Sequence, residues 1–530
     1  MSKWLVAIVG LAFVLRFWGI CDYPAGFSAD EVGQGYTAYS LLRTGKDEWG
    51  EALPIAPRSY GDYRAPLYTY LTIPFVAIFG LSEFAVRLPN VLIGTASVIV
   101  VYFLTKKILG NDQKLSLLAA FFLAISSWHI ALSRGAFEPN LPVLLIPLGW
   151  LAFENGKSNR AWMVFSAFVF GLGLFSYYSA RFVIPIFIFA LLLVNRKFEK
   201  LFLGVFLPFL IIAFATMLTG GGTRSADVAI VNPTGGWQEV SDRRYEAVLL
   251  GLPDWVSRIF NNKLTYTLGK FVENYLAFYS PQFLFTNGAG EATYGMKPGV
   301  GVLYLVELPL ILFGAVILAK NVKKYPYTLI LLILLVFPIP AALSKGPGFP
   351  ANRVALVMPF IQIVSVLGFM AIRNTFIKRA VLLVVFVLLV SFLESYFYQA
   401  PQANAESMSY GWREVMSEVS PIEPNYREIV VSRSLSEPQM FVAFYTRMDP
   451  YFVQEQSRDW LRYEDEGLLF VDQLGEYRLG KYTFRAINWG VDSEKEDTLF
   501  IGKPQDFPES VSPKVISYPN GTDALYIVEP

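Results

Sequence analysis

Two adjacent carboxylates, Asp30 and Glu31, follow the first apolar run of the chain, which extends from Trp4 to Ile20. Ser28 and Glu31 have the spacing of a capping box, in which a Ser hydroxyl and a Glu carboxylate bind free N–H groups at a helix start. Apolar residues then recur at helical spacing up to Gly45, a residue type typical of helix C-termini. The pattern predicts an amphipathic helix along a membrane surface, with Asp30 in the first turn, where the helix dipole favours a negative charge.

Four arginines are expected close to the outer ends of apolar runs. They are Arg64, Arg134, Arg181 and Arg353. A guanidinium can bind two oxygens of one phosphate or carboxylate at once, so such arginines are candidates for binding an anionic substrate. An arginine at a membrane surface can also reach toward lipid headgroups without any further role. The sequence predicts that one or two of the four bind a phosphate, and it leaves open which.

The composition points to the lipid bilayer. The chain has 530 residues, of which 54% are hydrophobic, 16% aromatic and 16% charged, whereas soluble domains carry about 25% charged residues. A net charge of +1 gives no reason to expect a nucleic-acid partner. Because there is one cysteine, Cys21, and one histidine, His129, a disulfide framework, a thiolate metal site and a histidine-based zinc site are excluded.

Eleven apolar runs can be drawn as membrane spans. They lie near residues 3–21, 84–105, 115–132, 139–154, 161–177, 182–195, 200–218, 300–319, 326–343, 354–371 and 379–397. Lysines and arginines gather beside every second loop, which predicts that these loops and the N-terminus are cytoplasmic. No small-residue cleavage signature follows the first run, so it is expected to be retained as a span. The run 66–79 is short and contains Pro74, and we interpret it as a second interfacial helix.

This topology predicts three large outer segments: a first loop over 22–83, an insertion over 219–299 and a tail over 399–530. The tail lacks long apolar runs and has mixed patterning. It predicts a helix over 405–419, a strand over 427–432, a helix near 439–447 and a hairpin across Pro519–Thr522. We therefore expect a membrane catalytic domain over 1–398 and a small extracytoplasmic α/β accessory domain over 399–530.

Several motifs form a familiar series with the Asp30-Glu31 pair. They are YRAPLY at 63–68, FGLSEFAVRLP at 79–89, SSWHIALSR at 126–134 and FSYYSAR at 175–181. The series resembles the GT-C superfamily of membrane glycosyltransferases, in the group of the lipid A aminoarabinose transferase and the dolichyl-phosphate-mannose protein mannosyltransferases. The resemblance implies an α-helical polytopic membrane protein of GT-C type, with about eleven transmembrane helices and interfacial helices in the first outer loop.

The resemblance also implies a reaction. A hexosyl or pentosyl group would pass from a polyprenyl-phosphate donor to a lipid, glycan or protein acceptor on the outer membrane face, with inversion at the anomeric carbon. Asp30 stands at the position of an active-site aspartate of the family, Glu31 is kept beside it as a catalytic candidate, although helix capping alone explains this residue and a structural role is favoured for it, and Glu138 is the candidate second acidic residue. No cofactor or metal is carried over, although a divalent cation held by carboxylates is compatible with the pattern.

The remaining predicted site residues bind substrate. They are Arg64, Arg134, Arg181 and Arg353 for the donor phosphate, and Tyr63, Tyr177 and Tyr178 for other parts of the substrates. The competing hypothesis is a lipid flippase or secondary transporter without transferase activity. Such a protein is expected to place ionisable residues along a path in mid-span, whereas these charges gather at the outer face.

Overall fold

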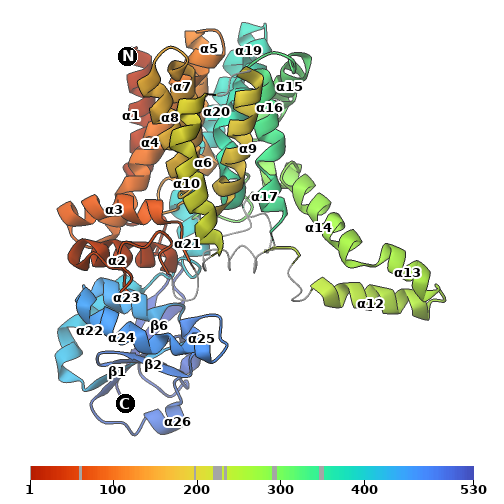
Figure 1. The fold of residues 1–530 in the computed structure, drawn as a ribbon. Coiled ribbons are helices and arrows are strands. Elements are labelled where there is room, and N and C mark those ends of the chain that lie inside the picture. The colour runs from red at the N-terminus through yellow and green to blue at the C-terminus, as the bar shows by residue number, and fades with distance from the viewer. Residues whose placement is uncertain are drawn as a thin grey trace.

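The computed structural model describes residues 2–58, 63–195, 199–218, 229–231, 236–288, 295–344 and 351–530, and the structural statements below refer to these residues. Most helices run side by side in one bundle, with the N-terminus at the end opposite the C-terminal sheet (Figure 1). The bundle helices are α1 (Lys3–Phe17), α4 (Glu83–Ile108), α5 (Gln113–Ile125), α6 (Ser127–Leu132), α7 (Asn140–Gly156), α8 (Arg160–Gly173), α9 (Tyr178–Asn195), α10 (Lys200–Leu218), α15 (Glu307–Lys320), α16 (Tyr327–Val336), α17 (Ile339–Ala342), α18 (Ala351–Val354), η3 (Ala355–Val357), α19 (Met358–Ala371) and α20 (Thr375–Glu394).

Each of the eleven predicted spans contains a helix, but the count of eleven transmembrane helices is not confirmed. Five described helices are long and apolar enough to cross a membrane: Glu83–Ile108, Tyr178–Asn195, Lys200–Leu218, Asn352–Ala371 and Thr375–Asn404. Others are shortened by breaks that the sequence contains. Ser126 ends α5, and its side chain accepts a hydrogen bond from the His129 N–H to start α6. Pro338 separates α16 from α17 in the same way, because proline disfavours continuation of the preceding helix.

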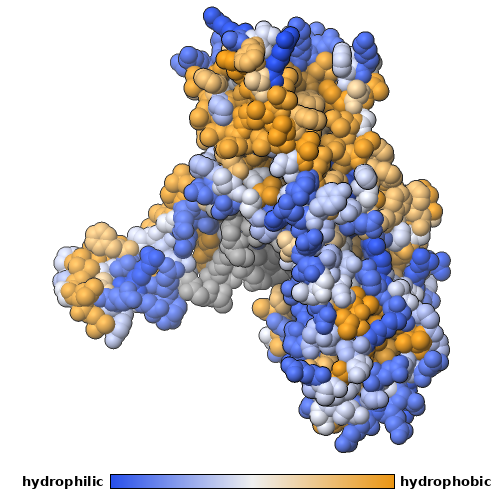
Figure 2. Space-filling view, turned by 180° about the vertical axis from the view of Figure 1, so that it is seen from behind, coloured by the Kyte–Doolittle hydropathy of each residue, from blue (hydrophilic) through white to orange (hydrophobic). Residues whose placement is uncertain are grey.

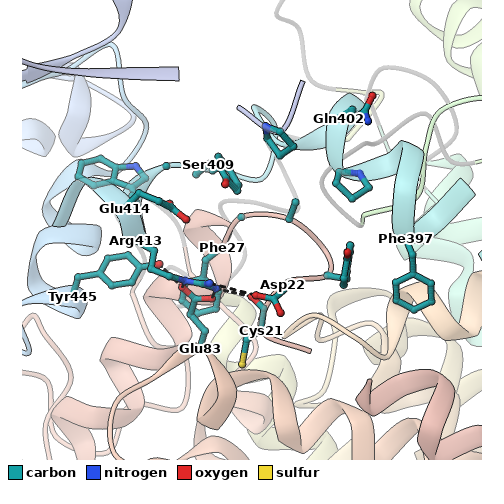
Figure 3. A pocket seen from close by; sticks show the side chains of 18 of the residues that line it. Cys21, Asp22, Phe27, Glu83, Phe397, Gln402, Ser409, Arg413, Glu414 and Tyr445 are labelled. Atoms are coloured by element: carbon teal, nitrogen blue, oxygen red, sulfur yellow. Dashed lines mark hydrogen bonds and ion pairs between the residues drawn. The ribbon is translucent and has the colours of Figure 1, made fainter. Parts of the chain in front are cut away.

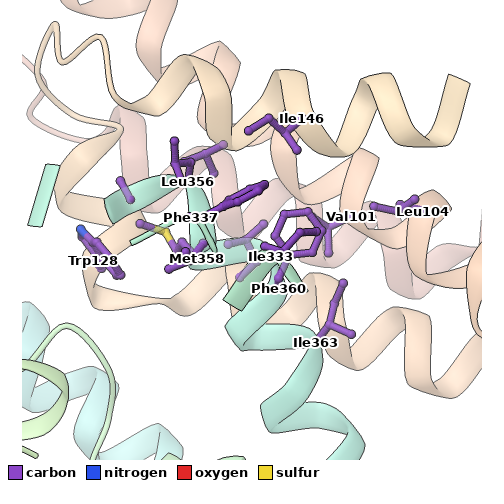
Figure 4. Close-up of a cluster of buried hydrophobic side chains, with 14 of the residues drawn as sticks. Val101, Leu104, Trp128, Ile146, Ile333, Phe337, Leu356, Met358, Phe360 and Ile363 are labelled. Carbon is purple, nitrogen blue, oxygen red and sulfur yellow. The ribbon is translucent and has the colours of Figure 1, made fainter. Parts of the chain in front are cut away.

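The bundle is held by close packing of apolar side chains. Figure 4 shows one part of this core, which contains Val101 and Leu104 of α4, Ile333 of α16, Phe337 directly after α16, and Phe360 of α19. All five side chains are fully buried. Close-packed contacts of this kind stabilise helix association in lipid, where the hydrophobic effect between helices is weak.

The outer surface of the bundle has the hydropathy of a membrane protein. Figure 2 shows hydrophobic side chains over the lateral surface of the bundle, and hydrophilic side chains at its far end and over the C-terminal region. Exposed apolar residues are dense on α10 and α20, where Ile211 and Phe386 are more than half exposed. The composition-based prediction of a membrane protein therefore agrees with where the apolar side chains lie.

Two helices of the predicted first outer loop run across the end of the bundle (Figure 1). They are α2 (Ala29–Thr44) and α3 (Pro66–Phe79). The capping box predicted for α2 is present, since Ser28 and Glu31 each accept the other's backbone N–H. Gly45 ends α2 in the left-handed conformation, with φ 70°, as a C-terminal glycine is expected to. The run 66–79 is thus a short helix packed against α2, as its length and Pro74 indicated.

The described part of the predicted 219–299 insertion forms an arm that leaves the bundle (Figure 1). It consists of α12 (Gly236–Leu249), α13 (Asp254–Phe260) and α14 (Lys263–Ala277). The following η1 (Gln282–Thr286) belongs to the bundle, where Phe283 and Phe285 are buried in the apolar core. The arm is attached where Tyr275 Oη donates a hydrogen bond to the Leu335 carbonyl, at 2.8 Å.

The C-terminal region, residues 412–530, is a mixed sheet with helices. The strands are β1 (Glu428–Ser432), β2 (Glu476–Leu479), β3 (Tyr482–Arg485), β4 (Thr498–Gly502), β5 (Lys514–Ser517) and β6 (Asp523–Val528), in the order β2-β3-β1-β4-β6-β5. The other elements of this region are α22 (Trp412–Ile422), η5 (Glu423–Asn425), α23 (Pro438–Tyr445), α24 (Pro450–Trp460), α25 (Arg462–Asp465), η6 (Val471–Gln473), α26 (Trp489–Asp492) and η7 (Pro504–Asp506). The bundle is joined to it through η4 (Ser395–Gln399) and α21 (Ala400–Asn404), which follow α20. The central strand β1 is parallel to β3 and β4, and its residues Ile429, Val430 and Val431 are fully buried.

Most predicted elements of this region are present. The strand over 427–432 is β1, the helix near 439–447 is α23, and the hairpin across Pro519–Thr522 joins β5 and β6. The helix predicted over 405–419 begins later, at Trp412. Gly411 has φ 104°, a conformation outside the right-handed helix, so the helix starts only after it.

Candidate active site

Asp30 is placed by the start of α2. The capping box fixes the first turn, because Glu31 Oε2 accepts the Ser28 N–H at 3.0 Å and Ser28 Oγ accepts the Glu31 N–H at 3.4 Å. Adjacent helical residues point about 100° apart, so the two neighbouring carboxylates face different surroundings. The Asp30 side chain is 66% exposed and the Glu31 side chain is fully buried.

Glu31 forms a buried ion pair with Arg87 of α4. Arg87 Nε lies 2.8 Å from Glu31 Oε1, and the same oxygen accepts the Ala136 N–H at 2.9 Å. The guanidinium also donates to the carbonyls of Ile20, Pro24 and Gly26. The pair therefore ties the start of the first outer loop, α2, α4 and the segment carrying Glu138 together. Since this geometry consumes both oxygens of Glu31, we interpret Glu31 as a positioning residue and do not retain the predicted catalytic role.

Arg64 lies beside Asp30 and is almost completely buried. Its Nη2 is 3.5 Å from Asp30 Oδ1, and its Nη1 donates to the Asp30 carbonyl at 3.4 Å. The guanidinium rests on Gly33, where a Cβ atom would come within 2.1 Å of Nη1. Burial acts to lower the pKa of Arg64, but nearby carboxylates, Asp30 foremost, outweigh it and raise the pKa. Arg64 is therefore a fixed positive charge next to Asp30.

Six of the ten predicted site residues line one cavity of about 380 Å³. They are Asp30, Arg64, Glu138, Tyr177, Tyr178 and Arg353. They come from five stretches of the sequence, which are the start of α2, the segment before α3, the segment between α6 and α7, the start of α9 with the residue before it, and α18. Much of the remaining lining is apolar and comes from α9, α16 and α17. Its side chains include Phe182, Val183, Ile186, Val336, Ile339 and Leu343.

The cavity also contains Gln34, which the sequence reasoning did not single out. Gln34 Nε2 donates to Glu138 Oε1 at 3.1 Å, so it fixes the second acidic residue of the cavity. Its position four residues after Asp30 places it on the same face of α2, and that spacing is the signal that could have identified it.

The other predicted residues do not line this cavity. The Arg134 guanidinium donates to carbonyls at the end of the first span, those of Leu15, Trp18, Gly19 and Tyr23. Arg181 Nε donates to the Leu174 carbonyl, and its guanidinium lies 4.8 Å from the ring centre of Tyr178. The Tyr63 carbonyl accepts a hydrogen bond from the Tyr178 hydroxyl. These three residues are not among the residues that line the cavity. Within the described part of the chain, both terminal nitrogens of Arg181 have no hydrogen-bond partner, so its predicted contact with the donor phosphate stays a prediction, as do the substrate contacts of Arg134 and Tyr63.

Two buried carboxylates adjoin Arg64 and were not predicted. Glu437 of the C-terminal region has its Oε2 3.9 Å from Arg64 Nη2. Glu48 is also buried, and its Oε1 accepts the Thr37 hydroxyl at 3.0 Å. Burial raises the pKa of both carboxyl groups to about 8. Within the described ranges, no group of three or more His, Cys, Asp or Glu residues is arranged to hold a metal ion.

A second cavity of about 380 Å³ lies where the C-terminal region meets the bundle (Figure 3). At its floor Arg413 forms an ion pair with Glu83 and lies 3.6 Å from Asp22. Tyr445 Oη donates to Glu83 at 2.6 Å. Because Arg413 and Glu83 come from opposite sides of this junction, the cluster attaches the C-terminal region to the bundle.

Comparison with known proteins supports the fold suggested by the motifs. Residues 63–219 match the family model of dolichyl-phosphate-mannose-protein mannosyltransferases. The structure of ArnT from Cupriavidus metallidurans bound to undecaprenyl phosphate is similar over 99% of both chains, with 12% identity and a TM-score of 0.52. The archaeal oligosaccharyltransferase AglB from Archaeoglobus fulgidus matches over 99% of this chain and 74% of its own, with 13% identity and a TM-score of 0.46.

No curated protein sequence matches the chain. The family-model match and the ArnT-like fold nevertheless confirm the resemblance to the GT-C glycosyltransferases that the motifs indicated. The chain has the fold of a GT-C membrane glycosyltransferase.

Proposed function

We propose that the protein is an integral membrane glycosyltransferase that moves a sugar from a polyprenyl-phosphate donor to an acceptor hydroxyl or amine with inversion. The observation that carries the proposal is the mixed lining of this cavity. The charged residues Asp30, Arg64, Glu138 and Arg353 line it together with apolar side chains of α9, α16 and α17. A polyprenyl-phosphate sugar has the matching construction, with a charged and hydroxylated head joined to a hydrocarbon chain. ArnT, which has the same fold, binds undecaprenyl phosphate, which is a polyprenyl phosphate without the sugar.

The reaction assigns Asp30 to the acceptor. A lone pair of the acceptor atom attacks the anomeric carbon, and the bond from that carbon to the phosphate oxygen breaks with its electron pair going to the phosphate. The proton of the acceptor passes to the Asp30 carboxylate. Asp30 suits this role because its side chain is exposed to the cavity while its backbone is fixed by the helix cap.

The departing phosphate needs positive charge close by. Arg64 and Arg353 both line the cavity and supply it without further reorganisation, which is the most effective form of electrostatic stabilisation. Glu138, held by Gln34, and the tyrosines Tyr177 and Tyr178 are then placed to bind sugar hydroxyls. We propose that these residues select the sugar, which is a hexose or a pentose.

The proposal includes an orientation. The N-terminus and the basic loops are cytoplasmic, and the cavity, the 219–299 insertion and the 399–530 segment lie on the outer face. Helix α2, whose first turn carries Asp30, lies at the end of the bundle that carries the C-terminal region (Figure 1). Residues 1–398 then supply most of the transfer site.

The decisive experiment is turnover by the purified protein in nanodiscs. A short-chain polyprenyl-phosphate sugar is supplied with a panel of acceptors, and release of free polyprenyl phosphate is measured. Release that depends on Asp30 supports the proposal. Transbilayer movement of the labelled lipid without any release would support the flippase alternative instead.

A further inference from the structure

The C-terminal region is docked along α2, the helix that carries Asp30. Tyr36 Oη donates to the Met448 carbonyl at 2.9 Å, and Gln454 Nε2 donates to the Asp47 carbonyl at 2.9 Å. Gly35 allows α23 to approach closely, because a Cβ atom there would lie 2.8 Å from the Phe444 ring. These contacts fix α23, α24 and the segment between them relative to α2 and the residues after it.

Glu437 precedes α23 in an unfavourable backbone conformation. Its φ of 48° and ψ of 43° are left-handed, which residues with a side chain seldom adopt. Pro438 follows, and a proline disfavours helical backbone angles in the residue before it. Strained residues of this kind persist where the surrounding structure holds them in place, and they are frequent at functional sites. The strain directs the Glu437 carboxylate toward Arg64.

Glu437 and Arg64 face each other with unused hydrogen-bonding atoms. Glu437 Oε2 lies 3.9 Å from Arg64 Nη2, and the two side chains are only 5% and 6% exposed. Among the described residues, Glu437 Oε2 and both Nε and Nη2 of Arg64 have no hydrogen-bond partner. The same Nη2 lies 3.5 Å from Asp30 Oδ1. One guanidinium nitrogen is therefore shared by a cavity carboxylate and by a buried carboxylate of the C-terminal region.

We propose that Glu437 is a positioning residue of the transfer site, which holds the Arg64 guanidinium between itself and Asp30 and so sets the charge that Arg64 presents to the cavity. The inference rests on the proposed function and deepens it. It also changes the role expected for the C-terminal region, which becomes part of the active site rather than an accessory.

The protonation state of Glu437 then determines how much of the Arg64 charge is available to the cavity. Burial raises the pKa of Glu437 to about 8, while Arg64 opposes the shift. The charged and titratable groups that face it are Arg64, Asp30, Asp472, Glu48 and Tyr477. Below pH 8 the Glu437 carboxyl is neutral, so the Arg64 guanidinium interacts with Asp30 and the donor phosphate. Above pH 8 the ionised carboxylate competes for Nη2, so donor binding is expected to weaken.

Two substitutions separate the effect of the Glu437 charge from the effect of its side chain as a whole. Glu437→Gln keeps the shape of the neutral carboxyl at every pH. Glu437→Gly removes the side chain at a backbone conformation that glycine adopts freely, so folding is expected to persist. Glu48→Gln is the matched control, because Glu48 is an equally buried carboxyl near Arg64 with its pKa also raised to about 8.

The assay is donor KM and kcat from pH 6 to 9.5. For the wild type, donor KM is expected to rise at least fivefold above pH 8. Glu437→Gln is expected to stay within threefold of wild type at pH 7 and to lose this rise, whereas Glu48→Gln retains it. Glu437→Gly is expected to raise donor KM at least tenfold at pH 7. A folded Glu437→Gly protein with wild-type KM, or a Glu437→Gln protein with the wild-type alkaline rise, overturns the proposal.

A second measurement does not depend on turnover. At pH 9, adding Glu437→Gln to the wild type is expected to shift the melting temperature. Adding it to the Arg64→Gln protein is expected to cause no shift, because that protein already lacks the ion pair between Glu437 and Arg64. If the wild type shows no transfer while this coupling is present, the proposed function fails and the contact between Glu437 and Arg64 stands. Equal shifts in both backgrounds overturn the positioning role.

Discussion

Replacing Asp30 with Asn is the sharpest test of the transfer mechanism. The substitution keeps the size of the side chain and leaves the capping box of Ser28 and Glu31 intact. It removes only the negative charge that is 3.5 Å from Arg64 Nη2. Loss of a general base slows a reaction by about 10²- to 10⁴-fold, which raises the barrier by about 3 to 5 kcal/mol.

The cost in stability is expected to be much smaller. The Asp30 side chain is 66% exposed, so its ion pair with Arg64 contributes about 0–1 kcal/mol after solvent screening. The favourable position at the helix N-terminus contributes about 0.3–1 kcal/mol. Together these give a loss of no more than about 2 kcal/mol. Catalysis and stability should therefore separate clearly in this variant.

Asp22 supplies a matched control for the charge. Its side chain is 67% exposed and lies 3.6 Å from Arg413 in the second cavity, so Asp22→Asn removes an ion pair of the same length and exposure. Both variants are assayed for steady-state release of polyprenyl phosphate and for thermal unfolding. A folded Asp30→Asn protein with turnover within threefold of wild type would refute the mechanism, as would an equal loss in Asp22→Asn.

Further expectations follow from the same geometry. Gly33→Ala places a Cβ atom 2.1 Å from Arg64 Nη1, so the guanidinium must move, and donor KM should rise at least tenfold, as in Arg64→Ala. Glu31→Gln removes one partner of a fully buried ion pair and should cost about 3–5 kcal/mol of unfolding free energy, measured by chemical denaturation. In a cysteine-free background, a membrane-impermeant thiol reagent should label Glu51→Cys but not Gln113→Cys on intact cells. Because arginines face the leaving phosphate, EDTA should leave turnover within about twofold.

Much of this architecture could be predicted from local signals. Ser28 and Gly45 marked the two ends of α2, and the short run with Pro74 marked α3 as a helix outside the spans. The number of spans could not be predicted in the same way. Hydropathy averages over internal breaks, so the chain on both sides of Ser126 reads as one run although the helix stops and restarts there.

The site was predicted only where a motif or a charge stood at an expected span end. Asp30, Arg64 and Glu138 were identified in this manner, and they do line one cavity. Arg134, like Arg64, is an arginine at an expected span end. Its guanidinium instead donates to backbone carbonyls at the end of the first span and just after it. Glu437 carries no local signal at all, because its significance comes from docking of a separate region more than 370 residues after Arg64.

The Asp30-Glu31 pair shows why residue type alone could not assign these roles. An α-helix turns about 100° per residue, so two consecutive carboxylates cannot both face one ligand. The capping box settles which one turns inward, since Glu31 must fold back toward the Ser28 N–H. That inward carboxylate then requires a buried cation, which Arg87 provides at 2.8 Å. Asp30 is left on the cavity side with Arg64, so the helix start separates a buried, paired carboxylate from one that lines the cavity.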